Sequence, residues 1–243
     1  MRSIAFITQK GGAGKTTLAA SIAAAAAGRG EKVIALDLDP QGSLVSWGKR
    51  RVAANPANRI IVEPLERDRL LHLSAILEGL AGAGFTLAVF DTAGADSAAV
   101  RLVADAADIC LLPARPTCLD VEATAGTFRA VYLAGRRAAF VLNQCPAAYR
   151  SVRVSDAAND LTRLGVLAEP ALSTRMDYQD AIAAGLGVTE YARDGRAAQD
   201  IQQLWRWILA QLGNSDAKTV AERGPAPRHV GLSDRLAGLG RLS

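Results

Sequence analysis

Hydrophobic residues in this chain gather into short runs, separated by longer stretches in which apolar positions recur with helical spacing. The short runs have the length and the Val, Ile, Leu and Phe content of buried strands. We expect strands at 3–8, 32–38, 60–62, 85–90, 108–112, 138–142 and 166–172. Helices are expected at 17–28, 44–52, 68–80, 149–164 and 197–212. Because strands and helices alternate, the pattern predicts a single doubly wound α/β domain on a mainly parallel sheet.

The composition changes after residue 212, and this change predicts a domain boundary. Gly, Pro, Ser, Asp and Arg dominate the last stretch, so we expect a folded domain at 1–212 and a flexible polar tail at 213–243. The end of the tail places Leu232, Leu236 and Leu239 at helical spacing with arginines between them. Interspersed glycines weaken an isolated helix there by about 1 kcal/mol each.

The stretch from Gln9 to Thr17 reads QKGGAGKTT and joins the first expected strand to the first expected helix. Its glycines let the backbone turn sharply and aim several N–H groups at one point, and the helix adds its positive N-terminal end, so the loop favours a polyanion. Lys15 is expected to reach the β- and γ-phosphates of a nucleotide, and the Thr16 hydroxyl to ligate Mg²⁺. The nucleotide-binding residues expected in this loop are Gly11, Gly12, Ala13, Gly14, Lys15, Thr16 and Thr17.

Carboxylates follow two other expected strands. Asp37 and Asp39 end the strand at 32–38, and Asp91 ends the strand at 85–90. Ligands of open parallel sheets gather at the carboxyl ends of the strands, so these acids are expected to face the phosphates. Asp91 would hold Mg²⁺ through a water molecule. A strand that ends in Asp is a weak signal alone, but it is a strong one as the third element of this set.

The segment after the strand at 138–142 bears on the base. A guanine site needs an Asp that pairs with the guanine N–H groups, and Pro146 occupies that place in Asn143-Gln144-Cys145-Pro146. The nucleotide is therefore predicted to be ATP.

Charge and composition exclude several other classes. Lys and Arg exceed Asp and Glu by 28 to 24, and a pI near 9.2 permits contact with nucleic acid or an anionic surface. Cys110, Cys118 and Cys145 form no C-x-x-C pair, which argues against a zinc site, a disulfide framework or a cluster-bearing reductase. No charge-free apolar run reaches the roughly 18 residues of a membrane span, and no secretory signal precedes the first strand. We expect a cytoplasmic protein.

The loop departs from the usual phosphate-binding pattern at two positions: Gln9 replaces the first glycine, and Lys10 adds a second lysine. In this form it resembles the deviant Walker-A ATPases of the ParA/MinD family, whose K-G-G-x-G-K-[ST]-T motif it matches. The stretch from Asp37 to Gly42 is similar to the family's D-x-D-P-Q-G segment. The resemblance implies that Lys10 contacts nucleotide across a dimer interface. It also implies that Asp39 positions the attacking water, with a contact to Mg²⁺ through water as a further role. The catalytic residues are then Lys10, Lys15 and Asp39.

Two further segments carry the resemblance. Residues 113–120 and 43–47 resemble the small ParF-like partition ATPases, in which the proline-bearing segment lies at the dimer interface; a stiff strand-to-helix connection is the alternative. Asn143 resembles the family's adenine-contacting asparagine, with a simple strand cap as its alternative. Arg175 belongs to a block shared with the family.

The resemblance covers 1 to about 212 and implies an ATP hydrolase that uses ATP and Mg²⁺. ATP would drive a homodimer that binds DNA without sequence preference on the nucleoid, and a centromere-binding or adaptor protein would stimulate hydrolysis, so that plasmid or chromosomal DNA is segregated or positioned. The candidate DNA-binding residues are Arg150, Arg153, Arg175, Arg193, Arg196 and Arg206. The alternatives are a MinD-like membrane-surface ATPase, which would use the tail leucines and arginines, and a positioning ATPase for a protein cargo. A membrane partner is not expected.

Overall fold

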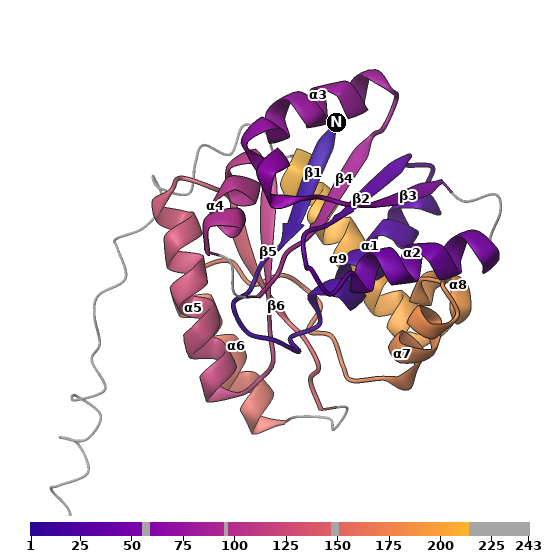
Figure 1. Cartoon of the computed structure of the whole chain (residues 1–243). Helices are drawn as coiled ribbons and strands as arrows, with labels where there is room; N and C mark the ends of the chain where they lie inside the picture. Colours follow the sequence, from indigo (N-terminus) through magenta and orange to yellow (C-terminus); the bar gives the residue numbers. More distant parts are fainter. Residues whose placement is uncertain (55–58, 95–96, 147–150, 214–243) are drawn as a thin grey trace, which may run out of the picture.

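The sheet is the organising layer of the molecule. A computed structural model describes residues 1–54, 59–94, 97–146 and 151–213. Its six strands are all parallel in the order β3-β2-β4-β1-β5-β6 (Figure 1). The strands are β1 (Arg2–Phe6), β2 (Val33–Asp37), β3 (Ile60–Pro64), β4 (Leu87–Asp91), β5 (Ile109–Ala114) and β6 (Ala138–Leu142). This confirms the predicted parallel α/β sheet.

Helices cover both faces of the sheet (Figure 1). One face packs against α1 (Lys15–Ala27), α2 (Ser43–Ala54), α7 (Met176–Ala183), α8 (Val188–Tyr191) and α9 (Arg196–Gly213). The other packs against α3 (Leu73–Gly82), α4 (Ser97–Ala106), α5 (Cys118–Leu133) and α6 (Val152–Leu164), with the 3₁₀ turn η1 (Arg67–His72) before α3. Alternate residues along β1 supply both cores: Ile4 and Phe6 point to the first, Ala5 and Ile7 to the second. The chain is doubly wound.

α1 is buried along almost its whole length, which explains its alanine-rich sequence. From Leu18 to Ala26 every residue of the helix is buried between the sheet and the helices of the same face. Small side chains permit a close approach: a Cβ atom on Gly187, just before α8, would lie 2.2 Å from the Cβ of Ala24. A helix that is apolar all round belongs inside the fold rather than at its surface.

Two predicted elements differ from the structure. The expected strand at 166–172 is wrong as a regular strand: Leu167 and Ser173 make only isolated parallel bridges, to Phe140 and Cys145. Pro170 lies between them and has no N–H to donate to a ladder. The expected helix at 68–80 is divided into η1 and α3. The first residues of the expected helix at 149–164 and the tail beyond residue 213 lie outside the described residues.

Candidate functional site

The predicted phosphate loop lies where the carboxyl ends of the central strands meet. Phe6 at the end of β1 is level with Asp91 at the end of β4, and Asp91 is level with Asp37 at the end of β2. The loop leaves β1 here and runs directly into α1, with Gly14 as the N-cap residue of the helix. Motifs far apart in the sequence therefore share one edge of the sheet, as the strand order requires.

Two glycines of the loop have conformations that other residues rarely adopt. Gly12 has φ 75° and Gly14 has φ 91°, both in the left-handed region. A Cβ atom on Gly14 would also lie 2.4 Å from Nδ2 of Asn143. Both backbone angle and space thus require glycine at position 14.

The side chains of Asn143 and Gln144, just after β6, donate hydrogen bonds to the backbone of the phosphate loop. Asn143 Nδ2 donates to the carbonyl of Ala13, and Gln144 Nε2 donates to the carbonyl of Gly12, each at 2.8 Å. Gln144 has φ 54°, which is uncommon for a residue other than glycine and is typical of functional sites. Sequence reasoning named Asn143 for adenine contact, which stays a prediction, and assigned no role to Gln144. Nothing in the sequence marks Gln144 except its place after a strand.

The loop hydroxyl and the β4 carboxylate that the sequence predicts for Mg²⁺ lie in direct contact. Thr16 Oγ1 donates to Asp91 Oδ2 at 2.6 Å. Asp91 is 1% exposed, and its other oxygen, Oδ1, is buried without a hydrogen-bond partner among the described residues. Mg²⁺ prefers carboxylate and hydroxyl oxygens, and an unpartnered buried carboxylate oxygen calls for a cation or a bound water. The side chains therefore fit the predicted magnesium site.

Burial raises the pKa of Asp91 to about 7. The Thr16 hydroxyl and the Lys15 ammonium lower this pKa, while the carboxylates of Asp37 and Asp39 raise it further. Burial and the two neighbouring carboxylates thus disfavour the charged form of Asp91, and a bound cation would favour it.

Lys15 is buried among these acids. Only 9% of the residue is exposed, and burial lowers the pKa of its ammonium against the opposing attraction of Asp91 and Asp39. The turn after β4 approaches it closely: a Cβ atom on Gly94 would lie 3.7 Å from Lys15 Nζ and 3.2 Å from the carbonyl oxygen of Gln9. Thr92 Oγ1 fixes the start of that turn by donating to the carbonyl of Phe6 at 2.9 Å.

The two acids after β2 have different surroundings. The Asp37 carboxylate accepts from the backbone N–H groups of Asp39, Leu44 and Val45 at 2.9–3.0 Å, so it caps the start of α2 and shapes the turn. These contacts give Asp37 a capping role that the sequence did not indicate, and its facing the phosphates stays a prediction. Asp39 is half-buried and accepts from the N–H of Gln41 at 3.0 Å.

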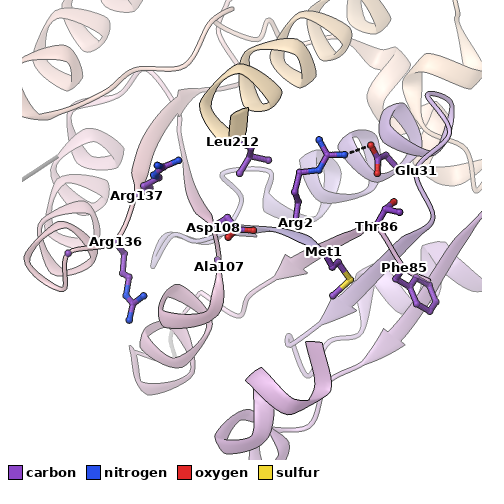
Figure 2. Close-up of a pocket in the computed structure, with 11 residues that line it drawn as sticks. Met1, Arg2, Glu31, Phe85, Thr86, Ala107, Asp108, Arg136, Arg137 and Leu212 are labelled. Atoms are coloured by element: carbon purple, nitrogen blue, oxygen red, sulfur yellow. Dashed lines mark hydrogen bonds and ion pairs between the residues drawn. The ribbon is translucent and has the colours of Figure 1, made fainter. Parts of the chain in front are cut away.

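A cavity of about 880 Å³ opens beside Asp39, lined by 37–42, 64–67 and 93–94 among others. A second cavity, of about 740 Å³, lies at the opposite, amino edge of the sheet (Figure 2). There Arg2 pairs with Glu31, and Asp108 accepts from the N–H and hydroxyl of Ser3. Arg136 also lines this cavity and pairs with Asp105, whereas the predicted nucleotide-binding residues lie at the carboxyl edge.

The structure does not bring the DNA-binding candidates together. Arg153 is exposed on α6, on one side of the sheet, whereas Arg193, Arg196 and Arg206 are exposed around α8 and α9 on the other. Arg175 is mostly buried and lies 3.5 Å from the carboxylate of Asp200. Arg150 lies outside the described residues. No single face of one subunit presents the whole set of described candidates.

Two further observations bear on a second subunit and on a membrane as partners. Lys10 is half-buried, and within the described ranges no carboxylate lies within ion-pair distance of it. Among the described helices, none combines the length and the hydropathy needed to cross a bilayer.

A glycine-rich loop between the first strand and the first helix, with a buried Lys, a Thr and a strand-end Asp around it, defines a P-loop nucleotide-binding protein. A sequence profile of the CobQ/CobB/MinD/ParA nucleotide binding domain matches residues 4–204, and the chain belongs to this family.

Relatives agree with this assignment. The chain is 33% identical to the maintenance of carboxysome distribution protein A of Gloeobacter kilaueensis over 214 residues, which cover 87% of this chain and 94% of the relative. It is 44% identical to the chromosome-partitioning ATPase Soj of Thermus thermophilus over 66 residues, about a quarter of each chain. The structure of the septum site-determining protein MinD of Pyrococcus horikoshii with Mg-ADP superposes with a TM-score of 0.66 at 17% identity, covering 89% of this chain and 99% of that one. The fold is therefore that of the ParA/MinD group.

Proposed function

We propose that this protein is a ParA-type ATPase that forms a sandwich dimer with ATP, binds DNA non-specifically and hydrolyses ATP when a partner protein stimulates it. The observation that carries the proposal is the pairing of Thr16 with Asp91 beside the buried Lys15, with one Asp91 oxygen left for a cation. We assign the folded domain to 1–212 and the tail to 213–243.

Residues around the loop take separate roles in the proposed reaction. Backbone N–H groups of the loop and Lys15 would hold the β- and γ-phosphates, and Thr16 and Asp91 would hold Mg²⁺, directly and through water. Bound Mg²⁺ neutralises charge on the phosphate oxygens. Asp39 lies on a turn fixed by Asp37 and would orient the attacking water. Asn143 and Gln144 hold the carbonyls of Ala13 and Gly12 and would thereby keep the loop in the conformation that binds phosphates.

Hydrolysis in this scheme needs a second subunit. Positioning and charge stabilisation supply most of the catalysis of phosphoryl transfer, and a lone subunit lacks part of the positive charge that the transition state needs. Lys10 of a second subunit would supply it. Nucleotide state then controls assembly, and assembly controls DNA affinity, because two subunits double the phosphate contacts.

The cargo of the proposed ATPase has a second candidate. The carboxysome-distribution relative aligns over 87% of the chain, whereas the chromosome-partitioning relative aligns over 27%. This difference in coverage favours a variant in which the DNA-bound dimer positions a protein assembly rather than DNA itself. Both variants share the same site chemistry.

One set of measurements tests the proposed function. ATP and GTP binding would be titrated, and ATP turnover measured alone, with duplex DNA, with liposomes and with the product of the adjacent open reading frame. We expect ATP to bind far better than GTP, Lys15→Ala to abolish binding, and turnover to rise with DNA and partner together. Equal affinity for GTP would refute the adenine assignment, and stimulation by liposomes alone would favour a membrane-surface ATPase.

A further inference from the structure

Arg115 is a charged residue beside the phosphate loop to which no role has yet been given. It follows β5, the strand that pairs with β1 on the side opposite β4. The loop therefore follows a strand that lies between β5 on one side and β4 on the other, with β2 and its Asp39 turn beyond β4. Arg115 Nη1 lies 3.9 Å from the position of a Cβ atom on Gly12, so the guanidinium reaches the loop itself.

The guanidinium is held in place by one contact. Arg115 Nε donates to Asp120 Oδ1 at 3.1 Å, and Asp120 is 2% exposed. Thr117, the N-cap residue of α5, fixes Asp120 through its hydroxyl and by accepting from the Asp120 N–H at 3.2 Å. These contacts fix the orientation of the Asp120 carboxylate, and the carboxylate in turn orients the guanidinium of Arg115.

This contact leaves the far end of the guanidinium available. A bidentate pair with a carboxylate would use two nitrogens, but Asp120 takes only Nε. Within the described part of the chain, Nη1 and Nη2 make no hydrogen bond, and 35% of the side chain is exposed. These nitrogens are the planar donor pair that suits a phosphate group.

The local charges leave one donor group for an anion. Lys15, the guanidinium of Arg115 and the positive N-terminal end of α1 all belong to the surroundings of one loop. Asp91 and Asp39 attract Lys15, and Asp120 holds Arg115 only through Nε, so the far end of the guanidinium is the donor that a phosphate group can use.

From these contacts we infer that Arg115 is a second phosphate-binding cation of the nucleotide site in its own subunit, and that Asp120 is its positioning residue. The inference rests on the proposed function, since it adds a ligand to the same site. It also gives the segment at 113–120 a role in the nucleotide site of a single subunit, where the sequence offered only a dimer interface or a stiff connection.

The test is equilibrium binding of Mg-ATP and Mg-ADP to Arg115→Gln, Arg115→Lys and Asp120→Asn, at protein concentrations too low for dimers. A hydrogen-bonded charge contact is worth roughly a tenfold to hundredfold change in affinity. We expect Arg115→Gln to lose about that much for at least one of the two nucleotides. Arg115→Lys should recover part of the loss, and Asp120→Asn should lose an intermediate amount because the cation remains but is no longer oriented.

A matched control removes the same charge elsewhere. Arg136 also donates through Nε to an aspartate, Asp105, at 3.0 Å, but at the amino edge of the sheet. Arg136→Gln should bind both nucleotides as the wild type does. Thermal unfolding without nucleotide separates the two roles of Arg115: recovery of affinity by Arg115→Lys at an unchanged unfolding temperature is expected for a phosphate ligand.

Three results would overturn the inference. The first is that Arg115→Gln binds both nucleotides within twofold of the wild type. The second is that Arg136→Gln loses as much nucleotide affinity as Arg115→Gln does. The third is that Arg115→Gln loses affinity only at protein concentrations at which dimers form. If Lys15→Ala loses binding while Arg115→Gln keeps it, only this inference fails. If the wild-type protein binds no Mg-ATP, the proposed function fails with it.

Discussion

At the scale of single residues, the site is defined by how each carboxylate is satisfied. Asp37 accepts from three backbone N–H groups and is part of the scaffold. Asp91 has one oxygen on Thr16 and one with no partner among the described residues. Aspartates at the ends of two neighbouring strands thus differ in their surroundings. Asp37 stabilises the start of α2, whereas Asp91 keeps an oxygen that could bind a metal ion.

The raised pKa of Asp91 has a consequence for stability. The folded protein keeps the Asp91 proton up to about pH 7, whereas the unfolded chain releases it near 3.8. Stability should therefore fall as pH rises from about 4 to about 7, by roughly 4 kcal/mol at most from this group. Asp91→Asn should remove this loss, so the variant should be more stable than the wild type at pH 8 and similar to it only near pH 4, below which both states of the wild type are protonated. Unfolding free energies without nucleotide or Mg²⁺ measure the difference, and a gap that is the same at both pH values would contradict it.

Asp39 should separate binding from hydrolysis. Truncation of the Asp39 side chain removes one hydrogen bond of its turn, from the N–H of Gln41, but leaves the hydrogen bond to Asp37. A nucleophile that lacks its positioning group, by contrast, reacts slowly. We expect Asp39→Ala to bind ATP within a fewfold of the wild type and to lose about a hundredfold in turnover or more, leaving a persistent dimer. Asp68→Ala, which removes an exposed acid on η1, is the charge-matched control. Wild-type turnover in Asp39→Ala would show that another residue orients the water.

At the scale of elements, α2 is fixed at both ends. Asp37 caps its start, and near its end the buried Arg51 forms an ion pair with Glu190 at 2.6 Å. Trp47 adds a hydrogen bond to the carbonyl of Leu186 at 3.1 Å, and a Cβ atom on Gly185 would lie 2.5 Å from the backbone of α2. The turn that carries Asp39 is thereby joined through α2 to α7 and α8.

Breaking that ion pair should destabilise the fold. Burial raises the pKa of Glu190, but hydrogen bonds from Arg51 and from the N–H of Gly187 outweigh it and leave the pKa below its usual value. Arg51→Met leaves Glu190 without its partner, and we expect a loss of roughly 2–4 kcal/mol. The pair's contribution is present above the usual pKa of Glu and should fade as pH drops through the lowered one.

Denaturant unfolding at pH 7 measures this loss. Arg163→Met removes the exposed, 3.8 Å pair with Asp160 and should change stability by no more than about 0.5 kcal/mol. A double variant, Arg51→Met with Glu190→Met, should recover part of the stability because no charge is left buried alone. Equal effects of the two single arginine variants would refute the special role of the buried pair.

The sequence predicts the elements better than their contacts. Apolar runs place both ends of all six strands to within two residues, because burial on both faces leaves a strong local pattern. The predicted strand at 166–172 is not a regular strand. Its apolar residues lie beside β6, but Pro170 interrupts the hydrogen bonding between them, and only isolated bridges form. The loop, Lys15, Thr16 and Asp91 were found by spacing. Gln144, Asp120 and the capping role of Asp37 were not, since each depends on which backbone group lies nearby in the fold.

At the scale of the molecule, DNA binding would have to be a property of the assembly. The exposed arginines lie on both sides of the sheet, and the net charge is only +4. We expect ATP-dependent affinity for unrelated duplexes that falls about tenfold or more between 50 and 200 mM salt, if three or more phosphates are neutralised. Filter binding with and without ATP tests this.

Charge-reversal variants would show which side of the sheet binds DNA. Arg193→Glu with Arg196→Glu alters the side of α8 and α9, and Arg153→Glu alters the side of α6. One of the two changes should abolish binding while the other leaves it within a fewfold. Strong DNA binding without nucleotide, or in Lys10→Ala, would reject the control of DNA binding by dimer formation.

The placement of the end of α9 has a practical consequence. Leu212 lines the cavity at the amino edge together with Met1, and Arg137 donates to the carbonyl of Gln211 at 3.0 Å (Figure 2). The phosphate loop lies at the other edge. A biotin or a fluorophore attached just after residue 213 would therefore be held away from the nucleotide, and molecules immobilised on a sensor surface by that point would present their loops outward. Arrival of a second subunit, or of DNA, could then be followed in real time without the attachment blocking the face under study.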